Sequence, residues 1–118
     1  MKRTALILSL CLSALVAPPV AEAKSLSRLL ASTGLAPDDF LSMGAAARSL
    51  YDRAEPAPGS TASWKNAQTG SKGTVRLEAL SGGCAALLHT IEAVGKPETQ
   101  PIRTKQCKDA NGNWQLSN

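Results

Sequence analysis

The stretch GTVRLEALSGGCAALLHTIEAV, residues 73–94, predicts two β-strands joined by a tight turn. Apolar and polar residues alternate over residues 73–79, a period typical of a half-buried antiparallel strand. Ser81-Gly82-Gly83 predicts a hairpin turn, and residues 84–94 predict the longest strand. The side chains expected on the buried side are Val75, Leu77 and Ala79 in the first strand and Leu87, Ile91 and Ala93 in the second.

Three shorter strands flank this hairpin, at residues 60–66, 102–108 and 113–116. Polar turns separate the segments at residues 66–70, 95–98 and 109–112, the last of which contains the turn-forming pair Asn111-Gly112. Connections this short favour antiparallel pairing, because parallel strands need a long crossover. We therefore expect a meander of about five short strands.

One amphipathic helix is expected before the sheet, over residues 40–54, and Pro56 and Pro58 follow it. Asp38 and Asp39 at its start are explained by capping and by the positive end of the helix dipole. The apolar stripe consists of Phe40, Met43, Ala47, Leu50, Tyr51 and Ala54. Such a stripe also suits a helix that binds a partner, but packing against the sheet is the simpler interpretation. The predicted fold class is α+β, with one amphipathic helix on a small, twisted antiparallel sheet.

The first 23 residues have the pattern of a secretory signal peptide. Lys2 and Arg3 precede an apolar segment that is too short to span a membrane, and Ala21-Glu22-Ala23 predicts cleavage between Ala23 and Lys24. A permanent N-terminal anchor is the alternative. A lipidated Cys11 is disfavoured, because Leu10 precedes it and a small residue is required there. We expect a flexible N-terminal segment at residues 24–37 and one domain at residues 38–118.

Cleavage leaves two cysteines, Cys84 and Cys107, and an even pair in an exported chain predicts one disulfide. The bridge closes a loop of about 24 residues and stabilises the fold by about 3 kcal/mol in the loop-entropy description. Antiparallel pairing places the start of one strand beside the end of the next, within reach of a bridge. A metal site and a redox pair are the alternatives. His89 is the only histidine, and C-x-x-C spacing is absent.

The charge balance is mildly basic. The chain has 13 Lys and Arg against 9 Asp and Glu, and loss of Lys2, Arg3 and Glu22 with the leader leaves 11 and 8, or about +3. Scattered basic residues and few aromatics argue against nucleic acid as a partner. A solvated mixed-charge surface is the simplest interpretation, and weak attraction to anionic envelope polymers is the alternative.

No catalytic constellation is present in the sequence. His89 lies between apolar residues of the longest predicted strand, where a packed histidine is more common than a base. Gly70-Ser71-Lys72-Gly73 lacks the residue order of a phosphate-binding loop. We therefore expect a protein that is not an enzyme and that needs no cofactor or metal.

The order of several short motifs resembles the C-terminal domain of the bacterial outer-membrane surface antigen family, which is related to the rickettsial 17 kDa surface antigen. The residues that carry the resemblance are Trp64, Asn66, Thr69, Gly70, Gly73, Val75, Cys84, Cys107, Gly112 and Trp114. The chain departs from the family in lacking a lipobox and a glycine-rich membrane-associated segment. Ala85 and Leu87 also stand where the family has an arginine and an aromatic residue.

The resemblance implies a surface-antigen-like domain of the Gram-negative cell envelope, in the periplasm or associated with the outer membrane or cell surface. We expect a non-enzymatic structural or adhesive role and an unidentified envelope component or protein as partner. We also expect a mature chain without a transmembrane segment, in peripheral contact with the outer membrane. A periplasmic binding module, such as an inhibitor of lysozyme or another hydrolase, is the alternative. Within the fold, we expect Trp64 and Trp114 to pack against each other over a small core.

Overall fold

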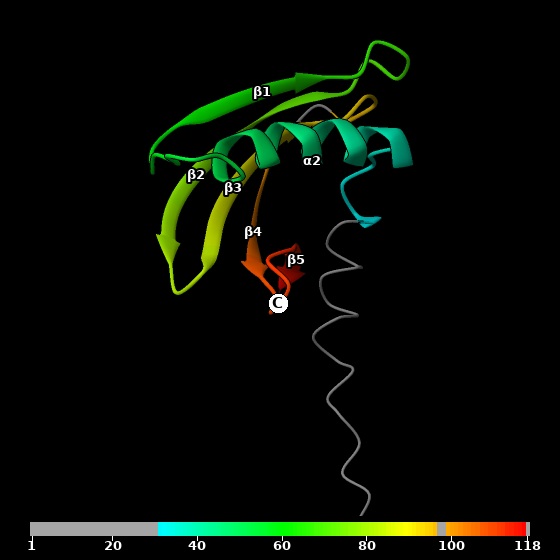
Figure 1. Ribbon diagram of the computed structural model, residues 1–118. Helices are drawn as coiled ribbons and strands as arrows, with labels where there is room; N and C mark the ends of the chain where they lie inside the picture. The colour runs from blue at the N-terminus through cyan, green and yellow to red at the C-terminus, as the bar shows by residue number, and fades with distance from the viewer. Residues whose placement is uncertain (1–30, 97–98, 118) are drawn as a thin grey trace, which may run out of the picture.

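The computed structural model describes residues 31–96 and 99–117, which form one helix and one five-stranded antiparallel sheet (Figure 1). The elements are α2 (Pro37–Tyr51), β1 (Thr61–Lys65), β2 (Lys72–Ser81), β3 (Cys84–Glu92), β4 (Gln100–Lys108) and β5 (Trp114–Ser117). The strands are arranged in chain order, so the predicted meander and the α+β fold class are confirmed. The predicted signal peptide and its cleavage site, Ala23–Lys24, lie outside the described residues.

The β2–β3 hairpin closes with the shortest kind of loop. Ser81 pairs with Cys84, and the two residues between them, Gly82 and Gly83, have φ of 58° and 76°. Positive φ at both central positions gives the turn a twist that matches the flanking strands, and glycine adopts it without steric cost. The prediction of a tight turn at these residues is therefore confirmed.

A β-bulge interrupts β2 and changes which side chains it buries. The pairing with β3 passes from Leu77 directly to Ala79, so Glu78 is an extra residue. Beyond the bulge Ala79 is exposed and Leu80 is half-buried and packed against the core. The prediction that Ala79 lies on the buried side was wrong, because strict alternation does not anticipate an inserted residue.

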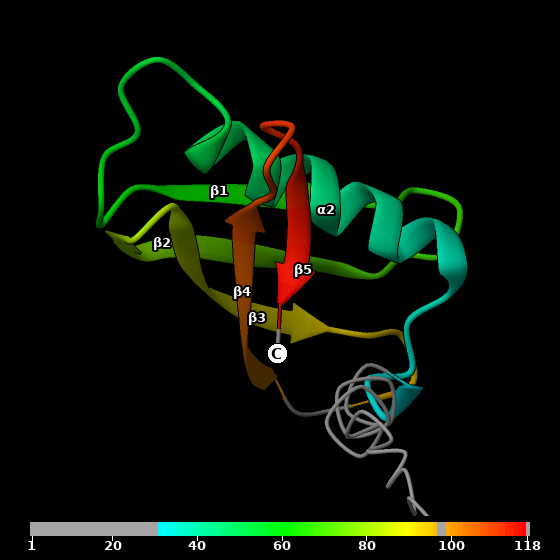
Figure 2. The same ribbon diagram turned by 60° about the horizontal axis from the view of Figure 1, so that its bottom comes forward.

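Helix α2 covers one face of the sheet and contacts β1 and β2 (Figure 1). We call this side the inner face and the opposite side the outer face. The sheet twists so strongly that β4 and β5 run across the direction of β1 and β2 (Figure 2). The helix ends at Tyr51 and Ala54 is exposed, so the prediction that the helix extends to residue 54 was wrong. The Asp52 amide makes the last helical bond, to the Arg48 carbonyl, and the Asp52 backbone then leaves the helical region (φ −91°, ψ 66°), so the helix ends before the prolines.

The core has two clusters, and the tryptophans belong to different ones. Trp64 is 6% exposed and packs with Met43, Ile91, Ala93 and Ile102. Trp114 is half-buried against the other cluster, and its ring meets that of Tyr51 edge-on with centroids 4.6 Å apart. The prediction that the two indoles pack against each other was wrong, because β1 and β5 form opposite edges of the sheet.

The predicted disulfide joins directly opposed residues. Cys84 and Cys107 are register partners in β3 and β4, with Cα atoms 4.0 Å apart and an S–S bond of 2.03 Å. The backbone N–H of Lys108 donates to the Gly83 carbonyl at 2.9 Å, so the hydrogen-bonded pair is Gly83 with Lys108. The next pair, Cys84 with Cys107, is therefore a non-hydrogen-bonded pair, in which facing side chains are closest.

The end of the predicted flexible N-terminal segment is packed. Thr33 is fully buried, Leu35 packs against the Trp64 cluster, and the Lys96 ammonium donates to the Ser32 carbonyl at 3.0 Å. Residues 31–36 therefore hold the start of α2 against the turn after β3, in contrast to the loose attachment expected for them.

Candidate functional site

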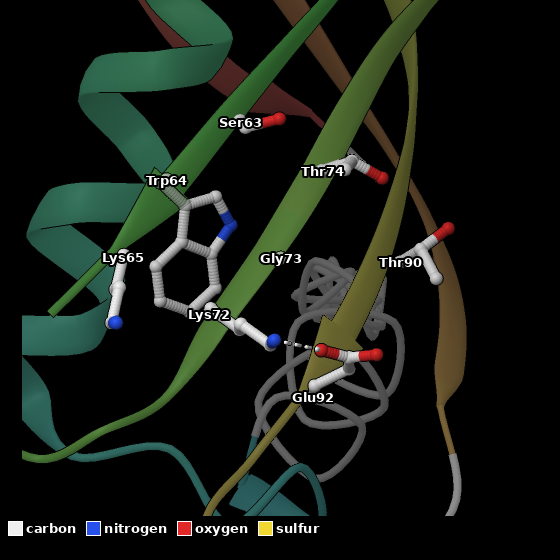
Figure 3. A pocket seen from close by; sticks show the side chains of 8 residues that line it. All are labelled: Ser63, Trp64, Lys65, Lys72, Gly73, Thr74, Thr90 and Glu92. Atoms are coloured by element: carbon white, nitrogen blue, oxygen red, sulfur yellow. Dashed lines mark ion pairs between the residues drawn. The ribbon is translucent and has the colours of Figure 1, made fainter.

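The outer face of the sheet is not covered by α2, and most of its side chains are exposed. The strand pairing shows which residues belong to the outer face, because every second residue of a strand faces the same side of the sheet. Three cross-strand rows lie next to one another: Lys65, Lys72 and Glu92; then Ser63, Thr74 and Thr90; then Thr61, Arg76, Leu88 and Arg103. Figure 3 shows the first two rows crossing β1, β2 and β3.

The central row presents three hydroxyl groups. Ser63 opposes Thr74, which in turn opposes Thr90. None of these hydroxyls forms a hydrogen bond within the described residues, so each is free to donate and to accept. Ser63 and Thr74 are exposed and Thr90 is half-buried. Together with the lysine row they line a depression of about 470 Å³ (Figure 3).

The outer face has an excess of positive charge. Within the described residues it carries five cations, Lys65, Lys72, Arg76, Arg103 and Lys105, and two carboxylates, Glu78 and Glu92. The Lys72 ammonium lies 3.4 Å from Glu92, and the Arg103 guanidinium lies 3.0 Å from Glu78. Exposed pairs of this kind contribute little stability. The other three cations form no ion pair in the described part of the chain, so the face attracts anions.

Trp64 and Gly73 also line this depression. They are register partners in β1 and β2, and the indole occupies the place where Gly73 has no side chain. A Cβ added to Gly73 would lie 2.5 Å from the Thr90 carbonyl oxygen and 2.8 Å from the indole Nε1. Real Cβ atoms essentially never have contacts under 3.0 Å, so a neighbour would have to shift. Glycine is therefore required here for the tryptophan to fill the core.

A buried carboxylate holds the loop between β1 and β2. Asp39 is 1% exposed, and its oxygens accept hydrogen bonds from the Asn66 amide at 2.9 Å, the Thr69 hydroxyl at 2.5 Å and the Ala36 backbone N–H at 2.8 Å. Burial raises the pKa of Asp39, but the hydrogen bonds from Thr69, the Ala36 amide and other donors outweigh it and keep the pKa below 3.8. Asp39 thus fastens the loop to the first turn of α2.

This network explains two of the motif residues. Asn66 and Thr69 belong to the motif pattern that resembles the surface antigen family, and the sequence context of Asp39 indicated only capping and the helix dipole. The capping part holds, because Asp39 is the third helical residue and accepts from the Ala36 N–H that precedes the helix. The bonds to Asn66 and Thr69, 27 and 30 residues away, were missed. A pattern within one segment carries no signal for such a long-range contact.

A second hollow of about 270 Å³ lies between α2 and the inner face of β3, β4 and β5. His89 is 3% exposed at this place, and its Nε2 lies 2.8 Å from the Thr104 hydroxyl. Burial lowers the pKa of His89 from 6.5 to about 4, so the ring is neutral at pH 7. Its Nδ1 is buried with no hydrogen-bond partner among the described residues. The structure thus places His89 in the core, as its apolar neighbours predicted.

The loop after β4 is organised by another aspartate. Asp109 Oδ1 accepts from the backbone N–H groups of Asn111 and Asn113, each at 2.9 Å. These backbone bonds, that to Asn113 foremost, keep the pKa of Asp109 below 3.8. Gly112 has a φ of 81°, so the predicted turn is present and leads Trp114 back toward the core.

Within residues 31–96 and 99–117, no three His, Cys, Asp or Glu side chains gather closely enough to hold a metal ion. None of the helices in that part of the chain has the length and apolar character needed to cross a membrane. Comparison with protein-family models, curated proteins and solved structures finds no match to this chain. The similarity to the surface antigen family stays a prediction from the motif residues.

Proposed function

We propose that this protein is a non-enzymatic, exported cell-envelope protein with a structural or adhesive role, attached through the outer face of its sheet. The observation that carries the proposal is the excess of cations on that face, around free hydroxyl groups. Three of those cations, Lys65, Arg76 and Lys105, form no ion pair within the described residues. Anionic polymers and lipid headgroups of an envelope are partners of complementary charge.

Two further features support export. The Cys84–Cys107 bridge is compatible with an exported protein, because disulfides persist in oxidising compartments. The leader pattern of residues 1–23 predicts the same route. The surface-antigen resemblance adds a Gram-negative envelope as the expected location.

Salt extraction of envelope fractions tests this attachment. We expect the protein to sediment with the envelope at low ionic strength and to be released by high salt without detergent, because salt screens exposed charges. Lys65→Gln with Arg76→Gln should lower the salt concentration needed for release. Arg53→Gln, which removes an exposed cation outside the sheet, is the matched control.

Two results would contradict the proposal. Release by detergent but not by salt would indicate a membrane anchor instead. Recovery as a stoichiometric complex with lysozyme or another hydrolase, with inhibition of that hydrolase, would favour the alternative function of a periplasmic inhibitor.

A further inference from the structure

On β2, charged and hydroxyl side chains alternate along the outer face, with Thr74 between Lys72 and Arg76. The lysine row, which also contains Glu92, lies two residues from the hydroxyl row. The arginine row lies two residues beyond, and its charged members are Arg76 and Arg103. Same-face neighbours on a strand are about 7 Å apart, so the two cationic rows are separated by about 13 Å. A strip of uncharged hydroxyl groups therefore lies between two strips in which two cations face one carboxylate, Glu92 in the first and Glu78 in the second.

We infer that the outer face binds an anionic polysaccharide that lies along the strands, with acidic groups at the two cationic rows and sugar hydroxyls at the row between. This inference rests on the proposed function and names the ligand class of the same site. Serine and threonine hydroxyls both donate and accept, which matches the double character of sugar hydroxyl groups. Lysine and arginine side chains supply the charge-assisted bonds to carboxylate or phosphate groups.

Other polyanions fit this face less well. Single-stranded nucleic acids bind by stacking bases on aromatic side chains. Among the aromatic residues that the structure describes, only Trp64 lines the depression, and its side chain is part of the core and 6% exposed. A membrane surface is usually held by apolar side chains as well as by charge. The large apolar residues that are exposed in the described part of the chain lie outside the strands of the outer face. Leu41 is on α2, Leu116 is on the inner face and Val94 is beyond the end of β3.

Binding to four probes tests the ligand class with the purified, oxidised mature protein. Polygalacturonate supplies both acidic groups and hydroxyls, dextran supplies hydroxyls alone, and polyphosphate supplies charge alone. Phosphatidylglycerol vesicles present anionic headgroups on a membrane. We expect the tightest binding to polygalacturonate, weaker binding to polyphosphate, and none to dextran or vesicles. Affinities are measured by calorimetry at low and at physiological salt.

Two sets of variants separate the contributions of charge and hydroxyl groups. Thr74→Val with Thr90→Val keeps side-chain shape and strand propensity, and should weaken polygalacturonate binding about tenfold with polyphosphate binding unchanged. Lys65→Gln with Arg76→Gln should weaken binding to both polyanions and flatten the salt dependence. Ser49→Ala on α2 is the matched control for the loss of a hydroxyl, and thermal melting confirms that each variant is folded.

The outcomes distinguish the inference from the proposed function. If polyphosphate or vesicles bind as tightly as polygalacturonate, or if the valine variant binds polygalacturonate normally, the inference is overturned, although salt-sensitive envelope attachment stands. If no polyanion binds and the Lys65→Gln, Arg76→Gln protein remains on the envelope like the wild type, both fail.

Discussion

Replacement of Asp39 by asparagine should destabilise the fold far more than expected for a residue that only caps an exposed helix end. The carboxylate is 1% exposed and accepts three hydrogen bonds, from Asn66 and Thr69 at one oxygen and from the Ala36 N–H at the other. An asparagine side chain has one oxygen and one NH₂ group. Either orientation therefore turns a donor toward a donor and leaves buried N–H groups unpaired.

The magnitude follows from those contacts. A hydrogen bond to a charged group contributes about 1.5–3 kcal/mol, and a buried donor left unpaired costs about 1–3 kcal/mol. We expect Asp39→Asn to lower the free energy of unfolding by about 3 kcal/mol, which for a domain of this size lowers Tm by about 12–24 °C. Asp38→Asn is the matched control. It changes an exposed carboxylate in the same helical turn, and should cost no more than about 1 kcal/mol through the helix dipole.

Urea unfolding at several pH values completes this test. The pKa of Asp39 is lowered in the folded protein, so its contribution is fully present above the unfolded pKa near 3.8 and is lost as pH falls through the folded pKa. The difference between wild type and Asp39→Asn should therefore be largest near neutral pH and shrink in acid. If Asp39→Asn and Asp38→Asn unfold at the same urea concentration at pH 7, the network does not stabilise the fold and this reasoning is refuted.

Three further perturbations test other parts of the structure. Gly73→Ala places a Cβ less than 3.0 Å from the Thr90 carbonyl and the Trp64 indole, so it should lower the free energy of unfolding by about 2 kcal/mol. Gly44→Ala, which has open space on α2, should raise it by about 1 kcal/mol. Equal effects of the two substitutions in urea unfolding would contradict the packing at Gly73. Replacing Cys84 and Cys107 by alanine should remove about 3 kcal/mol and abolish the effect of reductant on Tm, and a variant as stable as the oxidised wild type would be contrary evidence. Burial lowers the pKa of His89 in the folded protein to about 4, so its effect on stability depends on pH. The free energy of unfolding should be highest above pH 6.5 and fall by up to about 1.4 kcal/mol per pH unit as the pH drops toward 4. His89 is the one histidine of the chain, and an NMR titration midpoint near 6.5 would disprove its burial.

The local sequence patterns were sufficient to predict the order of the elements. Alternation in β2, the Gly82-Gly83 turn and the Asn111-Gly112 turn each act within a few residues, and the structure has all three. The disulfide also followed, since only Cys84 and Cys107 remain after the predicted cleavage and the meander brings them together. The strands and turns depend on residues that are close in the sequence, and the disulfide depends on the one pairing that two cysteines allow.

The features that were missed depend on twist and on long-range contacts. The bulge at Glu78 moved Ala79 to the outer face, and no residue type in β2 signals it. The placement of Trp114 beside Tyr51 follows from the position of β5 at the far edge of the sheet. The net charge of the whole chain predicted a mixed surface, whereas the register collects five of the cations on the outer face. That collection becomes visible only when the pairing of each strand is known.

The disulfide also has a mechanical consequence for a chain that is held at one end. Because Cys107 is bonded to Cys84, tension applied at the C-terminus can strip β5 from β4 but must then transfer through the covalent bridge to β3. While the bridge is intact, the 23 peptide units between the cysteines cannot be stretched, so the extended chain is shorter by about 80 Å of contour length. Reduction would release that length, so single-molecule extension of the protein should lengthen by this step in the presence of reductant. With the bridge intact, a tether attached at the C-terminus would thus leave residues 85–106 outside the path that carries the force.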